Sequence, residues 1–270
     1  MQSLLKDIKV IFEDGSFLAI NKPSGLVVHS DGRTEEESLV DWIKMKCNEG
    51  GGEAAALQEK IGNPHTLDSG RYFPRWGIVN RLDRETSGII LIAKTTVAFE
   101  NLQKQFIDRT IVKEYSALLW GSVEHSVKIT EPISRHKKDP RIWVCGLTNE
   151  EGGRNTSRDA ETDLEINSYH PQHLTLVKLL PKTGRTHQLR LHTRFIGHPI
   201  VGDTKYGING ITNEHSTKQI DSLLKELSDE DLEVDKNSRL MLHARSLEFT
   251  HPVTKEKIKL ETELPTDFNL

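Results

Sequence analysis

The sequence predicts an α+β fold built on a mixed, largely antiparallel central sheet with flanking helices. Short apolar runs of strand length are joined mostly by turn-forming residues, and helical patterns interrupt them at irregular intervals. This order does not fit the regular alternation of strands and helices that builds a parallel sheet. No internal repeat or linker-like stretch divides the 270 residues, so we expect one domain over residues 1–270.

The N-terminal part is predicted to begin with a β-hairpin. Its strands are residues 10–12 and 17–22, and the Asp14-Gly15 pair between them favours the positive φ of a tight turn. Residues 26–29 are predicted to form a further strand. A capping-box pattern then indicates a helix over residues 34–46.

The rest of the chain alternates irregularly between strand and helix patterns. Turn-rich residues 62–76 are expected to form a surface loop, and the almost wholly apolar residues 88–94 fit a strand buried on both faces. Thr95 or Thr96 then caps a helix. Residues 187–195 fit another helix, because apolar residues recur there at i and i+4. The remaining strands are expected at residues 111–121, 142–147, 164–166, 174–180 and 247–250.

The composition predicts a soluble, cytoplasmic protein. The mean hydropathy is −0.52, no apolar run is long enough to cross a bilayer, and the N-terminus lacks the apolar core of a signal peptide. Cys47 and Cys145 are too isolated in sequence for a metal knuckle, so we expect two reduced structural thiols.

Charge is unevenly distributed along the chain. The formal net charge is −4, which argues against binding of nucleic acid through bulk electrostatics. Residues 181–200 nevertheless carry four lysine or arginine side chains and no acid, and residues 135–141 are also basic. Residues 221–236 hold seven acids and two lysines, and we interpret residues 213–238 as an acidic insertion. A local basic face for nucleic acid is therefore compatible with the composition.

Asp83 lies in the segment RLDRETSG, residues 81–88, directly before the predicted buried strand. An Asp before Thr-Ser-Gly commonly forms a turn or caps a helix. Between Arg81 and Arg84, however, its carboxylate is expected to stay ionised, because nearby positive charge favours the ionised form. An ionised carboxylate on a rigid loop suits a nucleophile or a charge stabiliser better than a general acid.

The segment around Asp83 resembles a family signature. Residues 77–88, GIVNRLDRETSG, are similar to the pattern G-I-V-H-R-L-D-x-x-T-S-G of RNA pseudouridine synthases of the RluA family. Five more segments resemble motifs of that family in the family's order: residues 21–29, 113–117, 183–192, 197–203 and 242–245. The resemblance spans Ile11 to Pro252 and implies the pseudouridine synthase fold with a central RNA-binding cleft. Asn80 departs from the pattern, which has His there, and we expect its amide to support the loop through hydrogen bonds.

The resemblance implies an isomerase that converts specific uridines in ribosomal or transfer RNA to pseudouridine. The reaction breaks the N1–C1′ bond, rotates the uracil and forms a C5–C1′ bond, so it requires no redox change, cofactor or metal. It does require a base taken out of its stack, a carboxylate near the sugar and a group that removes a proton. Asp83 is then the essential carboxylate, either attacking C1′ or promoting glycosidic cleavage, and the sequence leaves both routes open.

Four further positions match residues of the family's active site. The resemblance implies that Tyr115 lies against the uracil and serves as a base, and that Arg190 pairs with Asp83. It also implies that Arg81 replaces the flipped nucleotide in the RNA stack, and that Leu242 lines the uracil pocket. Each has a plain structural alternative: a core aromatic, an exposed helix arginine, a salt-bridge partner and a core leucine.

RNA is the expected partner, with no membrane and no metal, and a monomer is the expected form. The chain is predicted to lack the small N-terminal RNA-binding domain that several family members carry, so the catalytic domain must supply the RNA contacts. The candidates for phosphate contacts, which position RNA without reading its sequence, are Lys182, Arg185 and Arg194.

The same residues allow three rival interpretations. A metal site at His187, His192 and His198 is disfavoured, because their spacings of five and six do not match zinc helices and no other ligand completes the set. A glycoside hydrolase using Asp83 and Glu85 is disfavoured, because residues two apart do not face each other across a substrate. A non-catalytic RNA-binding protein on the same fold is the remaining alternative, although simple binding does not need the Asp, Tyr and Arg together.

Overall fold

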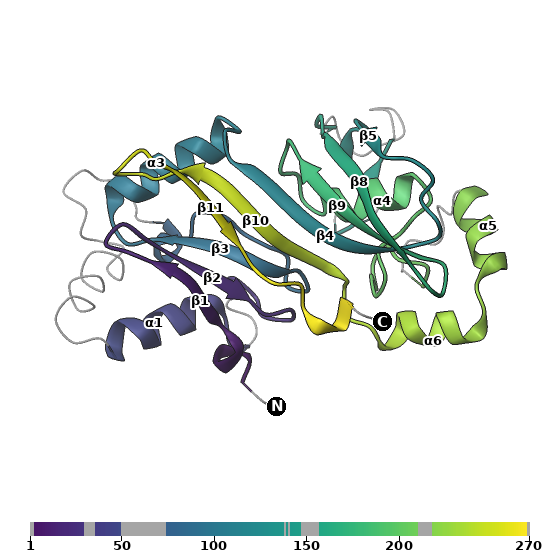
Figure 1. Ribbon diagram of the computed structural model, residues 1–270, viewed down its shortest axis with the longest axis horizontal. Coiled ribbons are helices and arrows are strands. Elements are labelled where there is room, and N and C mark those ends of the chain that lie inside the picture. The colour runs from purple at the N-terminus through teal and green to yellow at the C-terminus, as the bar shows by residue number, and fades with distance from the viewer. Residues whose placement is uncertain are drawn as a thin grey trace. The chain divides into compact units, whose positions relative to one another are not determined.

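The computed structural model describes residues 3–29, 36–49, 74–137, 139, 141–146, 157–209 and 218–268. The chain divides into two compact units, shown as ribbons in Figure 1. Unit 1 comprises Met1–Val112 and Ala244–Glu263, and unit 2 comprises Lys113–His243 and Leu264–Leu270. Both units combine antiparallel strands with helices, so the predicted α+β class with a largely antiparallel sheet is confirmed.

The strands of unit 1 come from two parts of the chain, one before and one after the segment that forms most of unit 2. Its strands are β1 (Lys9–Glu13), β2 (Phe17–Lys22), β3 (Ser87–Ala93), β10 (Leu242–Thr250) and β11 (Lys257–Glu261), except that the first two residues of β10 belong to unit 2. They lie in the order β1-β2-β3-β10, with β11 paired to β10. Its helices are α1 (Leu39–Glu49) and α3 (Thr96–Ile107), with short 3-10 helices η1 (Leu4–Asp7) and η2 (Pro74–Gly77). The pairings β1–β2, β2–β3 and β10–β11 are antiparallel.

The core of unit 1 centres on β3, all of whose residues are buried. Ile89 and Leu91 pack in one apolar cluster with Phe17 of β2, Leu102 of α3 and Phe249 of β10. A strand covered on both faces has no polar face to alternate with, which explains its continuous apolar run. This buried strand is the platform onto which the preceding loop is attached.

In unit 2, four antiparallel strands lie in the order β4-β9-β8-β5. These strands are β4 (Val112–Trp120), β5 (Val127–Ile129), β8 (Thr162–His170) and β9 (Leu174–Pro181). A separate two-stranded sheet joins β6 (Ile133–Arg135) to β7 (Trp143–Cys145). The helices are α4 (Gln188–Phe195), α5 (Lys218–Glu226), α6 (Asp229–Asn237) and the 3-10 helix η4 (Thr266–Phe268). Trp120, Leu179 and Leu240 belong to its main apolar cluster.

Most sequence-predicted elements are confirmed, but residues 26–29 do not form a strand. Within that segment, Val27 makes a single parallel bridge to Ser38. The predicted helix also begins later, at Leu39. Ser38 and Asp41 supply the hydrogen bonds at its start, because the Asp41 carboxylate accepts from the Ser38 amide at 3.0 Å and from its hydroxyl at 2.7 Å. Residues 34 and 35 lie outside the described residues.

The predicted N-terminal hairpin is confirmed, but its turn differs from the expected one. Gly15 is not among the glycines with positive φ in the described chain. Instead, the Asp14 carboxylate accepts hydrogen bonds from the Ser16 amide at 2.7 Å and the Phe17 amide at 2.9 Å. The turn is therefore closed by an Asp side chain that satisfies backbone donors, a second mechanism by which Asp favours turns.

The acidic segment is tied into unit 2 through buried carboxylates. Its described part consists of α5 and α6, while residues 213–217 lie outside the described residues. Asp231 forms a capping box with Ser228 at the start of α6. The Asp235 carboxylate accepts from the Trp120 indole at 2.8 Å and the Gly202 amide at 2.8 Å. Two of the acids are therefore structural, and whether the segment is an insertion stays a prediction.

Other expectations concern the loop at residues 62–76, the cysteines and the membrane. Residues 62–73 and the side chain of Cys47 lie outside the described residues. The thiol of Cys145 is free, and burial raises its pKa to about 12, so very little reactive thiolate forms at neutral pH.

Within the described ranges, every helix is too short or too polar to cross a bilayer.

Candidate functional site

The loop that carries Asp83 connects residue 80 to the buried strand β3 of unit 1. Asp83 is half-buried, and its carbonyl accepts a hydrogen bond from the Thr86 amide at 3.2 Å. Asn80 fixes the start of the loop, because its side-chain amide donates to the Ile89 carbonyl at 3.2 Å and accepts from the Leu91 amide at 2.8 Å. The expectation that Asn80 supports the loop through its amide is confirmed.

Lys22 fixes the same loop from the opposite side. Its side chain is fully buried, and its ammonium donates to the carbonyls of Pro23 at 2.8 Å, Leu26 at 2.9 Å and Arg84 at 2.9 Å. A lysine ammonium has three donors, so these contacts can occupy all of them. The carbonyl of Arg84 belongs to the residue after Asp83, so Lys22 holds the backbone directly beside the predicted carboxylate.

The turn after Lys22 adds further contacts to the Asp83 loop. The Gly25 amide donates to the Arg84 carbonyl at 2.9 Å, and the Ser24 hydroxyl donates to the Glu85 carbonyl. The Arg84 side chain returns to the Gly25 carbonyl at 3.1 Å and forms an ion pair with Glu36 at 3.1 Å. These hydrogen bonds therefore connect the turn at residues 23–25 to the loop that carries Asp83.

Gly88 marks the point at which the loop enters β3. Its φ is +117°, and a Cβ at this position would collide with the backbone of Ala244 on the neighbouring strand β10. Only glycine permits both the backbone conformation and the close approach. The glycine of the TSG segment is thus required by packing.

Arg81 differs from Arg84 in its surroundings. Arg81 is exposed to solvent, whereas Arg84 is bound to the neighbouring turn. An exposed guanidinium on a rigid loop next to Asp83 is available to stack on a base or to contact RNA. The structure therefore places Arg81 and Asp83 on one anchored loop of unit 1.

In unit 2, Tyr115 and Leu242 belong to one apolar cluster. Tyr115 lies on β4 opposite Leu179 of β9, is partly buried and packs against this cluster. Leu242 is buried. This placement is compatible with both interpretations of each residue: an element of the core and a wall of a base-binding pocket.

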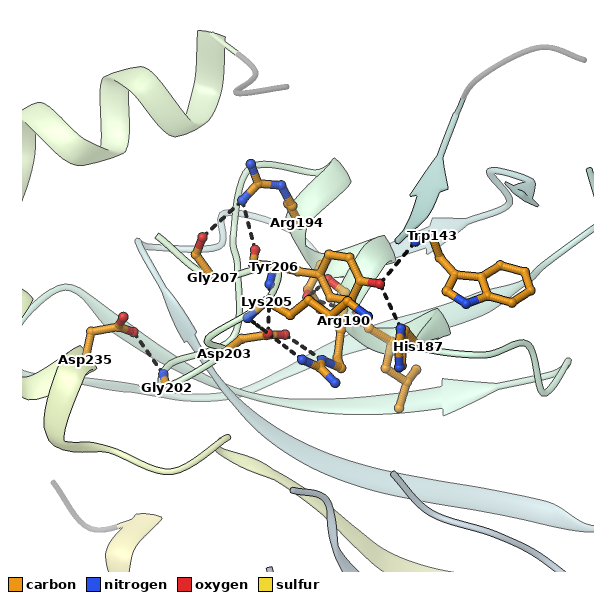
Figure 2. Close-up of polar contacts among 12 residues, drawn as sticks. Trp143, His187, Arg190, Arg194, Gly202, Asp203, Lys205, Tyr206, Gly207 and Asp235 are labelled. Atoms are coloured by element: carbon orange, nitrogen blue, oxygen red, sulfur yellow. Dashed lines mark hydrogen bonds and ion pairs between the residues drawn. The ribbon is translucent and has the colours of Figure 1, made fainter. Parts of the chain in front are cut away.

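Arg190 lies on α4 and is 4% exposed. Its Nε donates to Asp203 Oδ2 at 2.7 Å, and its Nη2 donates to Asp203 Oδ1 at 2.6 Å, as Figure 2 shows. Its guanidinium also lies over the ring of Tyr206, 5.1 Å from the centroid. The structural alternative of an exposed helix arginine is therefore wrong, and Arg190 is held by a two-point contact in a buried environment.

Arg194, also on α4, has a structural place rather than the expected phosphate contact. It is 7% exposed, and its Nη1 donates to the carbonyls of Tyr206 at 2.9 Å and Gly207 at 3.1 Å (Figure 2). Burial lowers the pKa of its guanidinium, while Asp203 raises it. The sequence-based expectation for Arg194 is corrected, because its helix turns the side chain into unit 2.

Lys182 and Arg185 flank the connection from β9 to α4 and remain accessible. The Lys182 ammonium is half-exposed and forms an ion pair with Asp163 at 3.1 Å. The Nε of Arg185 donates to the Asp159 carbonyl at 2.9 Å, which leaves the outer nitrogens of its guanidinium for another ligand. Both side chains can reach solvent, as a phosphate contact requires.

The three histidines considered as metal ligands have separate partners. His187 Nδ1 lies 2.7 Å from the Tyr206 hydroxyl, and His198 Nδ1 lies 2.9 Å from the Trp120 carbonyl. His192 is buried, with its Nε2 donating to the Glu131 carbonyl at 3.0 Å. Burial lowers the pKa of His192 more than this contact raises it. Across the described part of the chain, no three His, Cys, Asp or Glu side chains are grouped as metal ligands.

Sequence reasoning missed two residues, Lys22 and Asp203. Both lie within segments that carried the family resemblance, residues 21–29 and 197–203, and each is the sole charged side chain in its segment other than histidine. A charged residue in an otherwise apolar or turn-forming segment is the signal that could have found them, because such residues are rarely buried without a partner.

Comparisons with known proteins identify the family of the chain. Residues 16–195 match the family described as RNA pseudouridylate synthase. The chain is 31% identical over 262 residues to the uncharacterized RNA pseudouridine synthase YlyB of Bacillus subtilis (strain 168), covering 97% of this chain and 70% of the relative. It is 32% identical over 264 residues to ribosomal large subunit pseudouridine synthase C of Vibrio vulnificus (strain CMCP6), covering 96% and 66%.

Two solved structures share the fold. Human RNA pseudouridylate synthase domain containing 1 has a TM-score of 0.65 at 23% identity, covering 97% of this chain and 86% of that chain. Human RNA pseudouridylate synthase domain containing 4 has a TM-score of 0.65 at 24% identity, covering 98% and 91%. The family match and these relatives show that the chain belongs to the RNA pseudouridylate synthase family of the RluA type, isomerases that convert uridine in RNA to pseudouridine.

Proposed function

We propose that this enzyme isomerises specific uridines in ribosomal or transfer RNA with Asp83 as its reacting carboxylate. The observation that carries the proposal is the anchoring of the Asp83 loop by Asn80 and Lys22. A carboxylate contributes to catalysis only when it is held close to its productive position. The carbonyl of Arg84, one residue from Asp83, is fixed by both the Lys22 ammonium and the Gly25 amide.

In the proposed reaction, Asp83, Tyr115 and Arg190 act on the same uridine. Asp83 either attacks C1′ or promotes cleavage of the N1–C1′ bond. After the uracil rotates, C5 bonds to C1′, the proton on C5 is removed and N1 ends as an N–H group. Atoms and electrons balance within the nucleotide, so the proposal involves no cofactor or metal. Tyr115 is the candidate base, and Arg190 the candidate cation that pairs with the reacting carboxylate.

The proposed RNA contacts are carried by exposed basic side chains. Arg81 stacks in place of the flipped nucleotide, and Lys182 and Arg185 bind phosphates. Their exposure and their places on anchored segments support these roles. We further propose that Leu242 lines the uracil pocket and that the protein acts as a monomer in the cytoplasm.

The large ribosomal RNA is the first substrate to test, because several relatives are named ribosomal large subunit pseudouridine synthase C or D. Native protein and Asp83→Asn are incubated with unmodified ribosomal and transfer RNA, and pseudouridine is mapped at single-nucleotide resolution. The matched control is Asp108→Asn, an exposed acid at the end of α3 in the same unit. We expect a modified site with the native protein and the control, and none with Asp83→Asn.

Two other results would contradict the role of Asp83 or the catalytic function. Modification by Asp83→Asn at the native rate contradicts the role of Asp83. Tight RNA binding without modification by the folded native protein, in both RNA pools, favours the alternative of a non-catalytic RNA-binding protein. In that case Asn80→His, which restores the residue typical of the family at this position, is the next variant to assay.

A further inference from the structure

Asp203 is a buried carboxylate whose position is fixed by its own turn. It is 1% exposed, and its Oδ1 accepts hydrogen bonds from the Lys205 amide at 2.9 Å and the Tyr206 amide at 2.8 Å. Its carbonyl accepts from the Gly207 amide at 2.7 Å. A Cβ on Gly207 would collide with that carbonyl, so the turn can close only around glycine. The backbone of residues 203–207 therefore orients the carboxylate.

The carboxylate meets Arg190 through both of its oxygens (Figure 2). A single hydrogen bond lets a guanidinium swing about its donor, whereas the two-point contact through Nε and Nη2 fixes both its plane and its direction. With those donors bound to Asp203, the direction of the remaining N–H groups on Nη1 and Nη2 is fixed as well. The Arg190 side chain extends from α4, but its guanidinium is oriented by Asp203 of the turn at residues 203–207.

Tyr206 supports the same guanidinium from its face. The ring centroid lies 5.1 Å from the guanidinium carbon, a favourable distance for a cation over an aromatic face. The Tyr206 hydroxyl accepts from the Trp143 amide at 3.3 Å and lies 2.7 Å from His187 Nδ1. Both ends of the ring are therefore held, and Arg190 is confined at its edge by Asp203 and at its face by Tyr206.

We propose that Asp203 is a positioning residue for the isomerisation, acting through Arg190. The two-point contact fixes the plane and the direction of the Arg190 guanidinium, and so the direction in which its remaining N–H groups point. The inference rests on the proposed function, in which Arg190 is one of the catalytic residues. Asp203 does not touch substrate in this account, and its contribution to the rate is made through Arg190.

A purely structural ion pair is the competing explanation, and Asp235 provides the comparison. Asp235 is also a buried carboxylate of unit 2. It accepts from Trp120, Gly202 and Asn209, and among the described residues no arginine donates to it. Asp235→Asn therefore removes a buried carboxylate next to this turn, at Gly202, while the contacts of residues 203–207 with the Asp203 carboxylate and its contact with Arg190 stay in place.

The test compares single-turnover rates of pseudouridine formation and RNA affinities for native protein, Asp203→Asn and Asp235→Asn. Misplacing a catalytic group by about 1 Å can cost ~10²-fold in rate. We therefore expect Asp203→Asn to lose ~10²-fold in rate while its RNA affinity changes less than ~3-fold. Asp235→Asn is expected to lower the melting temperature but keep the native rate when assayed well below that temperature.

A double-mutant cycle shows whether Asp203 acts through Arg190. Residues that act as a unit are strongly non-additive, whereas independent effects multiply. Arg190→Lys alone is expected to lower the rate, and adding Asp203→Asn is expected to lower it by less than ~3-fold more. Multiplying losses would overturn the proposal and leave Asp203 with a structural role.

A spectroscopic measurement follows the guanidinium itself and does not depend on activity. In arginine-labelled protein, the Nε–H of Arg190 is expected to give a slowly exchanging NMR signal, assigned by its loss in Arg190→Lys. The signal should persist in Asp235→Asn and exchange rapidly in Asp203→Asn. An unchanged, protected signal in Asp203→Asn contradicts the proposal even if the protein is inactive on every RNA tested.

Misfolding of Asp203→Asn and failure of the proposed function are each distinguished from failure of the positioning role. If Asp203→Asn does not fold, Asp203→Glu is assayed, because it keeps the charge and displaces the carboxylate by one methylene group; the native rate in that variant overturns the proposal. Failure of the proposed function is recognised differently, since native protein and Asp83→Asn then both leave RNA unmodified. Failure of the positioning role alone leaves native protein active, Asp83→Asn inactive and Asp203→Asn at the native rate.

Discussion

Buried charged side chains determine the local geometry of both units at the residue scale. In unit 1, Lys22 binds three carbonyls; in unit 2, Arg190 binds Asp203. A buried ion is tolerated only where hydrogen bonds replace its hydration. Each of these side chains therefore demands one specific arrangement of its neighbours, which is the property that a catalytic loop needs.

Lys22→Met tests the anchoring of the Asp83 loop. The variant keeps most of the side-chain volume but removes the ammonium that donates to three carbonyls, of which only that of Arg84 keeps a second donor, the Gly25 amide. Since a buried group left unsatisfied costs about 1–3 kcal/mol, we expect the free energy of unfolding to fall by about 3 kcal/mol, measured by urea denaturation. Lys104→Met, which removes an exposed ion pair on α3, should cost less than about 1 kcal/mol. Equal losses in the two variants would argue against an anchoring role for Lys22.

His192 predicts how stability depends on pH. Burial lowers its folded-state pKa below the ordinary value of 6.5, so the unfolded chain binds a proton more readily than the folded one. Stability is therefore highest above pH 6.5 and falls as pH drops from 6.5 towards the folded pKa, by about 1.4 kcal/mol for each unit of difference. His192→Gln should flatten this dependence in urea titrations between about pH 7.5 and 5. Exposed His125→Gln is the control and should keep the native slope.

At the scale of elements, side-chain caps determine where helices begin. α3 starts at Thr96 because the Thr95 hydroxyl accepts from the Ala98 amide at 3.2 Å. α1 starts at Leu39 because Ser38 and Asp41 bind each other's backbone and side chain. In the first case sequence reasoning found the cap to within one residue. In the second it chose an earlier Thr with the same spacing, because local patterns cannot rank two caps that both fit.

Thr95→Ala and Thr96→Ala distinguish the two caps that the sequence left open. Loss of a threonine N-cap costs about 1 kcal/mol, so Thr95→Ala is expected to lower the free energy of unfolding by that amount. Thr96 is exposed at the first helical position, where alanine is the better helix former by a few tenths of a kcal/mol. Thr96→Ala should thus be neutral or slightly stabilising in urea denaturation. The reverse order would place the cap at Thr96.

At the scale of the whole molecule, acidic and basic residues are unevenly distributed, which the net charge of −4 does not reveal. Acidic residues gather on α5 and α6 and partly serve as structural carboxylates, whereas the accessible basic side chains Lys182 and Arg185 lie just before α4. RNA affinity is therefore expected to come from a few local contacts. This distribution explains why bulk charge alone is a poor guide to the partner.

The salt dependence of RNA binding tests which basic residues contact phosphates. Each phosphate contact contributes about 0.7–0.9 to the slope of log affinity against log salt. Lys182→Gln combined with Arg185→Gln should lower that slope by about 1.5. Lys225→Gln combined with Lys236→Gln, on the acidic helices, should leave it unchanged. An unaltered slope in the first pair would remove both residues from the proposed RNA contacts.

The sequence by itself determined the fold class, the buried strand β3, the candidate carboxylate Asp83 and the family resemblance. These follow from local periodicity and from motifs, both of which are properties of short segments. Only the tertiary structure decided that Arg194 points into unit 2, that Asp203 binds Arg190 and that Lys22 holds the Asp83 loop. Those contacts join residues far apart in the chain or on different sides of a turn. Which buried polar groups meet is determined by the packing of whole elements, and no short segment of sequence contains that information.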